Sequence, residues 1–176
     1  MIKIKNLTKL DMTDADLPNE PFTVWGRMTP LFDGNAWSYV TSMFDESFEM
    51  CFPDFHYEMT DGVVFLGAYD EAECVGLAVL KEDMFSYLCL DDLKVCRDFR
   101  KKGVGKQLVE ACMNEAKTRG KTGVYAIAQD NNLSACLFYL RCGFEIGGFD
   151  NRSYRGTNQA EKSNIFFYRD VNNDIE

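Results

Sequence analysis

The sequence predicts an α+β fold in which helices pack on a mixed α/β sheet. Strand-like apolar runs follow one another between residues 63 and 95, with short turns of Asp, Glu and Gly between them. A run with helical spacing follows from Val104 to Ala116, and strands and a second helix alternate after it. A strand meander followed by the order βαβαββ is typical of a mixed sheet that helices cover.

The central part of the chain predicts an antiparallel meander. Its runs are apolar, and polar residues that favour turns separate them. Ahead of them, IKIKNLT alternates as a strand does. The stretch LPNEPFTVWGRMTPLF mixes Pro, Gly and aromatic residues and indicates neither helix nor strand strongly. The three meander strands are expected at residues 63–69, 74–80 and 87–95.

The second half of the chain alternates strands with two helices. Gly120 is a suitable stop for the helix that begins near Val104. A second helix is expected over residues 131–142, with Asp130 or Asn131 as its N-cap and Gly143 as its end. The remaining strands are expected at residues 123–129, 144–149 and 164–168.

Length and composition narrow the class of protein. The 176 residues fit one domain, 1–176, with 171–176 as a frayed tail. No apolar run reaches the roughly 18 residues of a membrane helix, and the start lacks the apolar core of a signal peptide, so we expect a cytoplasmic protein that binds no membrane. The net charge of -9 and a pI near 4.7 argue against nucleic-acid binding and suit a cationic ligand.

Metal sites, disulfides and a histidine-based triad are not expected. None of the seven cysteines forms a CxxC pair, and most lie in apolar runs where Cys acts as a small hydrophobe. His56 is the only histidine, and no G-x-S-x-G surrounds a serine.

Positive charge gathers at the turn between the last meander strand and the first long helix. The local charge is +5, so the rest of the chain carries -14. Gly103 and Gly105 let the chain approach a ligand closely, and the first helical N–H groups have no internal partner. Together with the helix dipole these groups favour a phosphate or pyrophosphate. The charged residues are Lys94, Arg97, Asp98, Arg100, Lys101, Lys102 and Lys106.

The turn does not fit two common phosphate-binding patterns. GVGKQ has no Ser or Thr after its lysine, which excludes a P-loop, and Leu108 stands where the dinucleotide fingerprint has its third glycine. What remains is R-x-x-G-x-G, formed by Arg100, Gly103 and Gly105. A solvated basic turn that caps a helix is the alternative interpretation, and the strand before, the helix after and the local charge favour an anion site.

This turn resembles the acetyl-CoA-binding motif of the GNAT acetyltransferases, [QR]-x-x-G-x-[GA] after a strand. Downstream, NLSACLFYLRCGF fits the family's pattern N-x-x-A-x-x-x-Y-x-x-x-G-F. Within that family, residues 17–169 resemble the streptothricin acetyltransferases, including FRKKGVGKQL, QDNNLSACLFYLRCGFEIGGFD and IFFYRD. The resemblance implies the GNAT acyl-CoA N-acyltransferase fold, a twisted and mostly antiparallel sheet with a splay between strands four and five and helices on both faces. GNAT folds often pair through late strands, so a homodimer is compatible with it.

The resemblance also implies the residues that hold acetyl-CoA. The basic turn would bind the pyrophosphate chiefly through backbone N–H groups, and the fourth strand would align the pantetheine arm and offer an N–H to the thioester carbonyl. Asn132, in the second motif, would contact the same arm, or would simply belong to the first turn of its helix. The implied cofactor residues are Leu93, Lys94, Val95, Arg100, Lys101, Lys102, Gly103, Val104, Gly105, Lys106, Asn132, Ala135 and Tyr139.

Transfer of an acetyl group to an amine needs a base and an acid. An alkylammonium is charged at neutral pH, so a carboxylate or a water chain must take its proton. Asp91 and Asp92 are the candidates; neighbours in a strand point to opposite faces, so at most one should face the acceptor, and we favour Asp92. Tyr139 matches the position of the family's general acid toward the CoA sulfur, although its apolar neighbours would also suit a core aromatic residue.

The acceptor is expected to be a small cationic amine, most like the β-lysine amine of streptothricin. Three departures from the streptothricin acetyltransferase pattern leave alternatives open: Ile127 replaces a Glu, Asp91-Asp92 replaces Glu-Asp, and Asn-Arg-Ser-Tyr follows the Asp at 150. A polyamine, another small molecule or a protein amine could be acetylated instead, or the chain could bind CoA without turnover. Candidate acceptor residues are Asp150, Tyr154, Trp37 and Tyr39.

Overall fold

The structure is a computed structural model and describes residues 1–83 and 86–171. The chain divides into two compact units, and each is described here by itself. The first comprises Met1–Glu20, Cys51–Val124 and Asp170–Glu176, and the second comprises Pro21–Met50 and Tyr125–Arg169. The prediction of a single domain stays a prediction, and all but the first residue of the expected frayed tail lies outside the described residues.

The first unit is built on four antiparallel strands in the order β1-β4-β5-β6. The meander predicted from the sequence is confirmed, and so are the strand near the N-terminus and the first long helix. The strands are β1 (Lys3–Asn6), β4 (Val63–Asp70), β5 (Glu73–Glu82) and β6 (Tyr87–Val95). The helices are η1 (Lys9–Asp11), α1 (Met12–Ala15), η2 (Arg97–Phe99) and α2 (Val104–Thr118).

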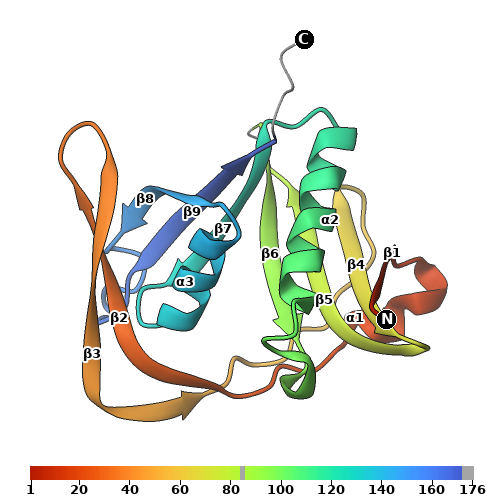
Figure 1. The fold of residues 1–176 in the computed structure, drawn as a ribbon, viewed down its shortest axis with the longest axis horizontal. Coiled ribbons are helices and arrows are strands. Elements are labelled where there is room, and N and C mark those ends of the chain that lie inside the picture. The colour runs from red at the N-terminus through yellow and green to blue at the C-terminus, as the bar shows by residue number, and fades with distance from the viewer. Residues whose placement is uncertain (84–85, 172–176) are drawn as a thin grey trace. The chain divides into compact units, whose positions relative to one another are not determined.

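Helices cover both faces of this four-stranded sheet, as predicted. On one face α2 packs against β4, β5 and β6 (Figure 1), and the contact is close enough that a Cβ at Gly76 would lie 3.2 Å from Leu108. On the other face Ala15 of α1 joins a core cluster with Phe65, Leu77 and Val79. Burial of these apolar side chains is the main force that holds the helices to the sheet.

The second unit combines a long hairpin with three strands and one helix. Residues 22–50 form the hairpin of the two long strands β2 (Phe22–Phe32) and β3 (Trp37–Met50), both labelled in Figure 1. The other strands, β7 (Gly123–Gln129), β8 (Glu145–Asp150) and β9 (Asn164–Asp170), follow the order β7-β9-β8, and α3 spans Leu133–Arg141. The first two residues of β7 and the last of β9 belong to the first unit. The strands predicted at 123–129, 144–149 and 164–168 are confirmed.

The N-cap predicted for the second helix was wrong. Asn132 is the N-cap of α3, and its side chain accepts a hydrogen bond from the Ala135 N–H at 3.2 Å. Asp130 cannot cap the helix because its carboxylate has other partners. It lies 3.3 Å from the Arg27 guanidinium and accepts a hydrogen bond from the Ser163 N–H at 3.1 Å.

Two further features bear on the class of the protein. None of the helices within the described ranges is long and apolar enough to cross a membrane. All seven cysteines are free thiols, and three of them, Cys112, Cys136 and Cys142, are buried.

Candidate active site

The basic turn between β6 and α2 exposes a row of backbone N–H groups. The turn bends through two left-handed residues, Lys101 at φ +61° and Gly103 at φ +85°. Gly103 is the N-cap of α2, and the first helical hydrogen bond runs from the Gln107 N–H to its carbonyl at 3.1 Å. The N–H groups of Val104, Gly105 and Lys106 therefore come before the first helical bond and are free to bind an anion.

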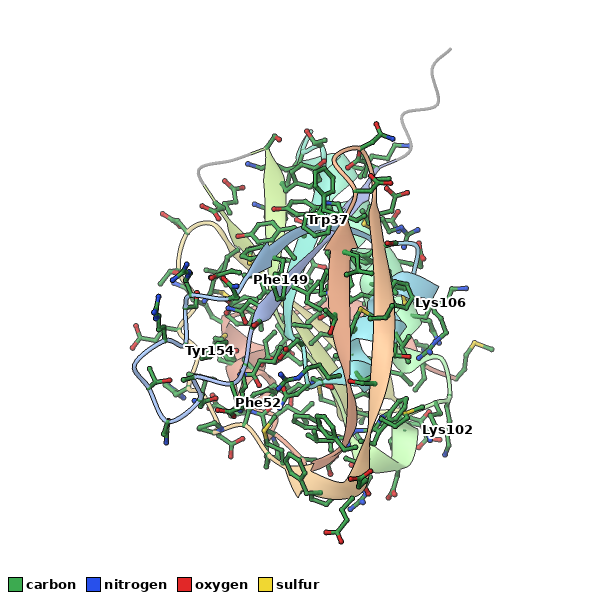
Figure 2. The ribbon with its side chains drawn as sticks, turned by 90° about the vertical axis from the view of Figure 1, so that its left-hand side faces the viewer. Trp37, Phe52, Lys102, Lys106, Phe149 and Tyr154 are labelled. Atoms are coloured by element: carbon green, nitrogen blue, oxygen red, sulfur yellow. The ribbon has the colours of Figure 1, made fainter. Side chains whose placement is uncertain are left out.

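Lysine side chains surround these N–H groups. Lys101, Lys102 and Lys106 are exposed, and the Lys102 ammonium lies 5.4 Å from the centre of the Phe99 ring. Figure 2 shows Lys102 and Lys106 at the start of α2. Flexible cations beside a helix N-terminus add long-range attraction for a phosphate to the directional backbone donors.

Arg100 fixes the shape of the turn rather than extending into solvent. Its Nε donates to the Val95 carbonyl at 2.9 Å, and its Nη2 lies 3.3 Å from the Glu20 carbonyl and 3.5 Å from a Glu20 carboxylate oxygen. The same carboxylate accepts a hydrogen bond from the Arg97 N–H. Glu20 thus ties both ends of the 97–100 segment, and sequence reasoning missed it because it lies 77 residues away from Arg97.

A β-bulge in β6 overturns one expectation about the carboxylates. Leu90 pairs with Leu80 and Asp92 with Val79, so Asp91 is the extra residue. The Asp91 carboxylate lies 2.6 Å from the Lys81 ammonium, and Lys81 and Val79 are two apart in β5, on one face. Both carboxylates therefore lie on the same face of the sheet, and the prediction that they point to opposite faces was wrong.

Asp92 belongs to a small polar cluster that the sequence did not reveal. The Tyr57 hydroxyl donates to Asp92 Oδ2 at 2.9 Å, and the Lys94 ammonium lies 3.2 Å from the same oxygen. The Lys94 ammonium also lies 5.7 Å from the centre of the Tyr57 ring. Burial, and then the charge of Asp92, raise the pKa of Tyr57 above its usual value, so Tyr57 is a neutral donor.

In the second unit, the start of α3 is held close to β2. Gly26 forms a parallel bridge with Asn132, and a Cβ on Gly26 would lie 2.8 Å from Leu133. The Trp25 indole N–H donates to the Ser134 hydroxyl at 2.8 Å. The helix that carries Asn132, Ala135 and Tyr139 therefore has a fixed N-terminus.

Tyr139 is buried in an aromatic cluster. Its ring centre lies 5.3 Å from that of Phe144, 5.5 Å from that of Phe167 and 5.6 Å from that of Phe138. Such packing fixes the ring plane. A fixed ring is needed whether Tyr139 is only a core aromatic residue or also the general acid toward the CoA sulfur.

The candidate acceptor residues of the second unit have different environments. Asp150 accepts hydrogen bonds from the Ser153 hydroxyl and from the Arg152 and Ser153 N–H groups, which lower its pKa and hold its own loop. Tyr154, on the loop after β8 (Figure 2), accepts from Gln129 Nε2 at 2.9 Å and donates to Asn164 at 3.0 Å.

The two aromatic candidates on the hairpin lie near its turn. Trp37 faces Phe32 across the hairpin with ring centres 4.9 Å apart, and Figure 2 shows it near the turn of the ribbon. Tyr39 pairs with Pro30 and is 43% exposed. Trp37 is held by its cross-strand partner, whereas Tyr39 offers more surface to a ligand.

The predicted site residues fall into two sets. The basic turn, Leu93–Val95 and the two aspartates belong to the first unit, where the turn follows directly on β6. Asn132, Ala135, Tyr139 and the acceptor candidates belong to the second unit. Tyr57 and Glu20 were not predicted because both lie outside periodic segments, where only tertiary structure reveals what a side chain meets.

Comparison with protein families identifies a match. The chain fits the acetyltransferase (GNAT) family over residues 32–144, which include the basic turn and the Asn132–Phe144 motif. It is 34% identical to streptothricin acetyltransferase A of Bacillus subtilis (strain 168) over 169 residues, 94% of this chain and 98% of the relative. A streptothricin acetyltransferase of Escherichia coli is 29% identical over 58% of this chain and 59% of its own length.

Solved structures show the same similarity. A protein of Bacillus anthracis (strain Ames), provisionally assigned as a streptothricin acetyltransferase and crystallised with acetyl coenzyme A, superposes with a TM-score of 0.87. It is 28% identical, over 97% of this chain and 99% of its own. Nourseothricin acetyltransferase, 20% identical, superposes with a TM-score of 0.80 over 97% of this chain and 98% of its own, which concerns the fold alone.

Proposed function

The chain belongs to the GNAT acetyltransferase family and is an acetyl-CoA-dependent N-acetyltransferase, and we propose that it acetylates the β-lysine amine of streptothricin. The observation that carries this proposal is the similarity to streptothricin acetyltransferase A over nearly the whole chain, including the N-terminal hairpin region. A single acetylation of this amine removes a positive charge from the antibiotic. The antibiotic would thereby be inactivated.

The residues of the first unit fit acetyl-CoA. A Cβ at Gly103, where φ is +85°, would meet nothing within 4 Å, so there is open space beside the turn that carries the N–H groups of Val104, Gly105 and Lys106. We propose that these N–H groups and the exposed lysines hold the pyrophosphate. Bound acetyl-CoA supplies the activated acetyl group as a thioester.

Residues of β6 would align the rest of the cofactor. Leu93, Lys94 and Val95 pair with Ala78, Leu77 and Gly76 of β5. In an antiparallel ladder only alternate residues turn their N–H and C=O groups toward a given partner. The others on β6 point away from β5, and we propose that they bind the pantetheine amides and the carbonyl oxygen on which negative charge develops.

Two side chains would move the protons, and a third would contact the cofactor. Asp92 would receive the proton of the acceptor ammonium, directly or through water, and Tyr139 would give a proton to the departing sulfur. Asn132 would contact the pantetheine arm while it caps α3. Outside the basic turn the chain carries a net charge of -14, which suits a cationic acceptor.

Acceptor-dependent release of thiol from acetyl-CoA tests this proposal. The assay compares streptothricin with spermidine and lysine as parallel acceptors, and the Gly103→Glu variant controls for acetylation that does not need the cofactor site. Release with streptothricin alone is expected. Release with spermidine or lysine instead would keep the enzyme class and refute the acceptor.

A different amine is the second candidate, and one observation favours it. Ile127, at the position where the streptothricin acetyltransferase pattern has Glu, is 43% exposed on β7, so an apolar surface replaces a charge there. Such a surface suits an acceptor with fewer cationic groups. The parallel acceptors in the same assay separate the two candidates.

Three sequence predictions stay predictions alongside the proposal. They are a location in the cytoplasm, a homodimer, and a splay of the sheet between its fourth and fifth strands. Light scattering on the purified protein measures the oligomeric state directly, with a mass of twice 20.1 kDa expected for a dimer.

A further inference from the structure

Asp92 is held by one of its two carboxylate oxygens. Tyr57 donates to Oδ2 at 2.9 Å and the Lys94 ammonium lies 3.2 Å from that same atom. Among the described residues, no other hydrogen bond or ion pair reaches the Asp92 side chain, which is 20% exposed. The second oxygen, Oδ1, is therefore available to a ligand.

Lys94 gives Asp92 a buried counter-charge. The Lys94 side chain is only 8% exposed, and Asp92 is its sole carboxylate partner within the described ranges. Its ammonium is not aligned for a hydrogen bond, so the attraction is chiefly Coulombic. A buried ammonium without a counter-charge is strongly unfavourable, so the pair stays together.

Tyr57 adds direction to this attraction. A phenol O–H prefers to lie in the plane of its ring, and the Tyr57 ring packs edge-on against Phe65 with centres 5.8 Å apart. The hydroxyl therefore fixes the rotation of the carboxylate that the ion pair alone would leave free. A hydrogen bond to a charged group is among the stronger ones in proteins.

Asp91 has a different environment, although it lies on the same face. Its partner Lys81 is 43% exposed and Asp91 itself is 34% exposed, so this ion pair is screened by water. No tyrosine fixes Asp91 among the described contacts. The two neighbouring carboxylates thus differ in how firmly they are held.

We infer that Tyr57 and Lys94 are positioning residues that hold Asp92 by Oδ2 and leave Oδ1 to receive an N–H of the acceptor amine. This inference rests on the proposed function and names Asp92, rather than Asp91, as the carboxylate that meets the amine. The side chains of Tyr57 and Lys94 touch neither the amine nor the cofactor in this role. They act through the geometry of Asp92.

A double-mutant cycle tests the inference. Tyr57→Phe, Asp92→Asn and the double variant are compared with the wild type, using whichever amine gives acceptor-dependent thiol release. We expect Tyr57→Phe to lower kcat/KM for the amine about tenfold or more without changing the affinity for acetyl-CoA. In the Asp92→Asn background the same change should have almost no further effect, because its target is gone.

Tyr69→Phe is the matched control. Tyr69 is another tyrosine of the same apolar cluster whose hydroxyl donates to a carboxylate, that of Asp14 on α1. The Tyr69→Phe variant should lose stability as Tyr57→Phe does, but its turnover should equal that of the wild type. Equal losses of turnover in Tyr57→Phe and Tyr69→Phe, or additive losses in the cycle, would overturn the inference.

A measurement without any acceptor separates this inference from the proposed function. The ¹³C signal of the Asp92 carboxylate should move in Tyr57→Phe and in Lys94→Met but not in Tyr69→Phe. If no amine releases thiol, the proposed function fails while this signal still reports on Asp92. An unchanged Asp92 signal in Tyr57→Phe would overturn the inference whatever the acceptor is.

Discussion

Replacing Gly103 by glutamate should weaken acetyl-CoA binding about 30-fold and leave the fold intact. Gly103 has φ +85°, and a Cβ there would meet nothing within 4 Å, so the side chain has room and only the backbone is strained. Holding an L-residue in the left-handed region costs about 1 kcal/mol. A domain of this size tolerates that loss, so the variant should fold.

The new charge weakens binding because it repels the pyrophosphate. Two unit charges about 4 Å apart repel by about 1 kcal/mol in a medium like water, and by more where water is excluded. A pyrophosphate presents about two such charges at the N–H groups of Val104 to Lys106, so the repulsion is about 2 kcal/mol. The backbone strain is the same in the free and the bound protein, so it lowers stability but not affinity, and the repulsion alone corresponds to roughly 30-fold in affinity.

Two variants separate strain from charge. Gly103→Lys has the same backbone strain with the opposite charge, and it should not weaken binding. Gly120→Glu places the same charge at the other end of α2, where Gly120 is also left-handed, at φ +64°, with nothing within 4 Å of its Cβ position. It should leave acetyl-CoA affinity unchanged.

Titration calorimetry with acetyl-CoA measures all three variants, and circular dichroism checks that each is folded. Added salt should weaken wild-type binding and reduce the difference in acetyl-CoA affinity between Gly103→Lys and Gly103→Glu, because salt screens the charge interaction. If Gly103→Glu binds as the wild type does, or if the lysine and glutamate variants are equally weak, the assignment of the turn as the pyrophosphate site is refuted.

Three further outcomes are expected. Tyr139→Phe should cut turnover about 100-fold with little change in acetyl-CoA affinity, measured by steady-state kinetics; near-normal turnover would leave Tyr139 a packing role. Gly26→Ala places a Cβ 2.6 Å from the Ser42 carbonyl oxygen and should lower the unfolding free energy in urea by about 1–3 kcal/mol. A thiol reagent at pH 8 should modify exposed Cys51 in the folded protein but Cys112, whose pKa burial raises to about 12, only after unfolding, as peptide mass spectrometry would show.

Periodic segments of the sequence predicted their structure well. The strand over residues 123–129 and the strand over 87–95 begin and end where expected, and α2 starts at Val104. The strand at 123–129 is an apolar run between Gly123 and Asp130, and the apolar residues of α2 recur at helical spacing after Gly103. The ends of such segments follow the local pattern, whereas the bulge at Asp91 inside β6 does not.

The hairpin of β2 and β3 shows why the N-terminal third could not be predicted. β3 is exposed along most of its length, so it has no buried face to impose an alternation of apolar and polar residues. Pro30 within β2 and the glycine at 26 also argue against a strand by local rules. Gly26 is there because the carbonyl of Ser42 and the side chain of Leu133 leave no room for a Cβ, which is a tertiary reason.

The carboxylates of β6 depend on a single inserted residue. Without the bulge at Asp91, strict alternation would put one aspartate on the face covered by α2 and the other on the opposite face, beside a lysine. The bulge brings both to the opposite face, where Lys81 neutralises one and Lys94 with Tyr57 holds the other. The sequence shows two adjacent aspartates but not which is fixed, because the distinction comes from Tyr57, 35 residues away on an irregular segment. The sequence therefore predicts which residue types lie at this site. Which of the two carboxylates is firmly held depends on contacts that only the folded chain makes.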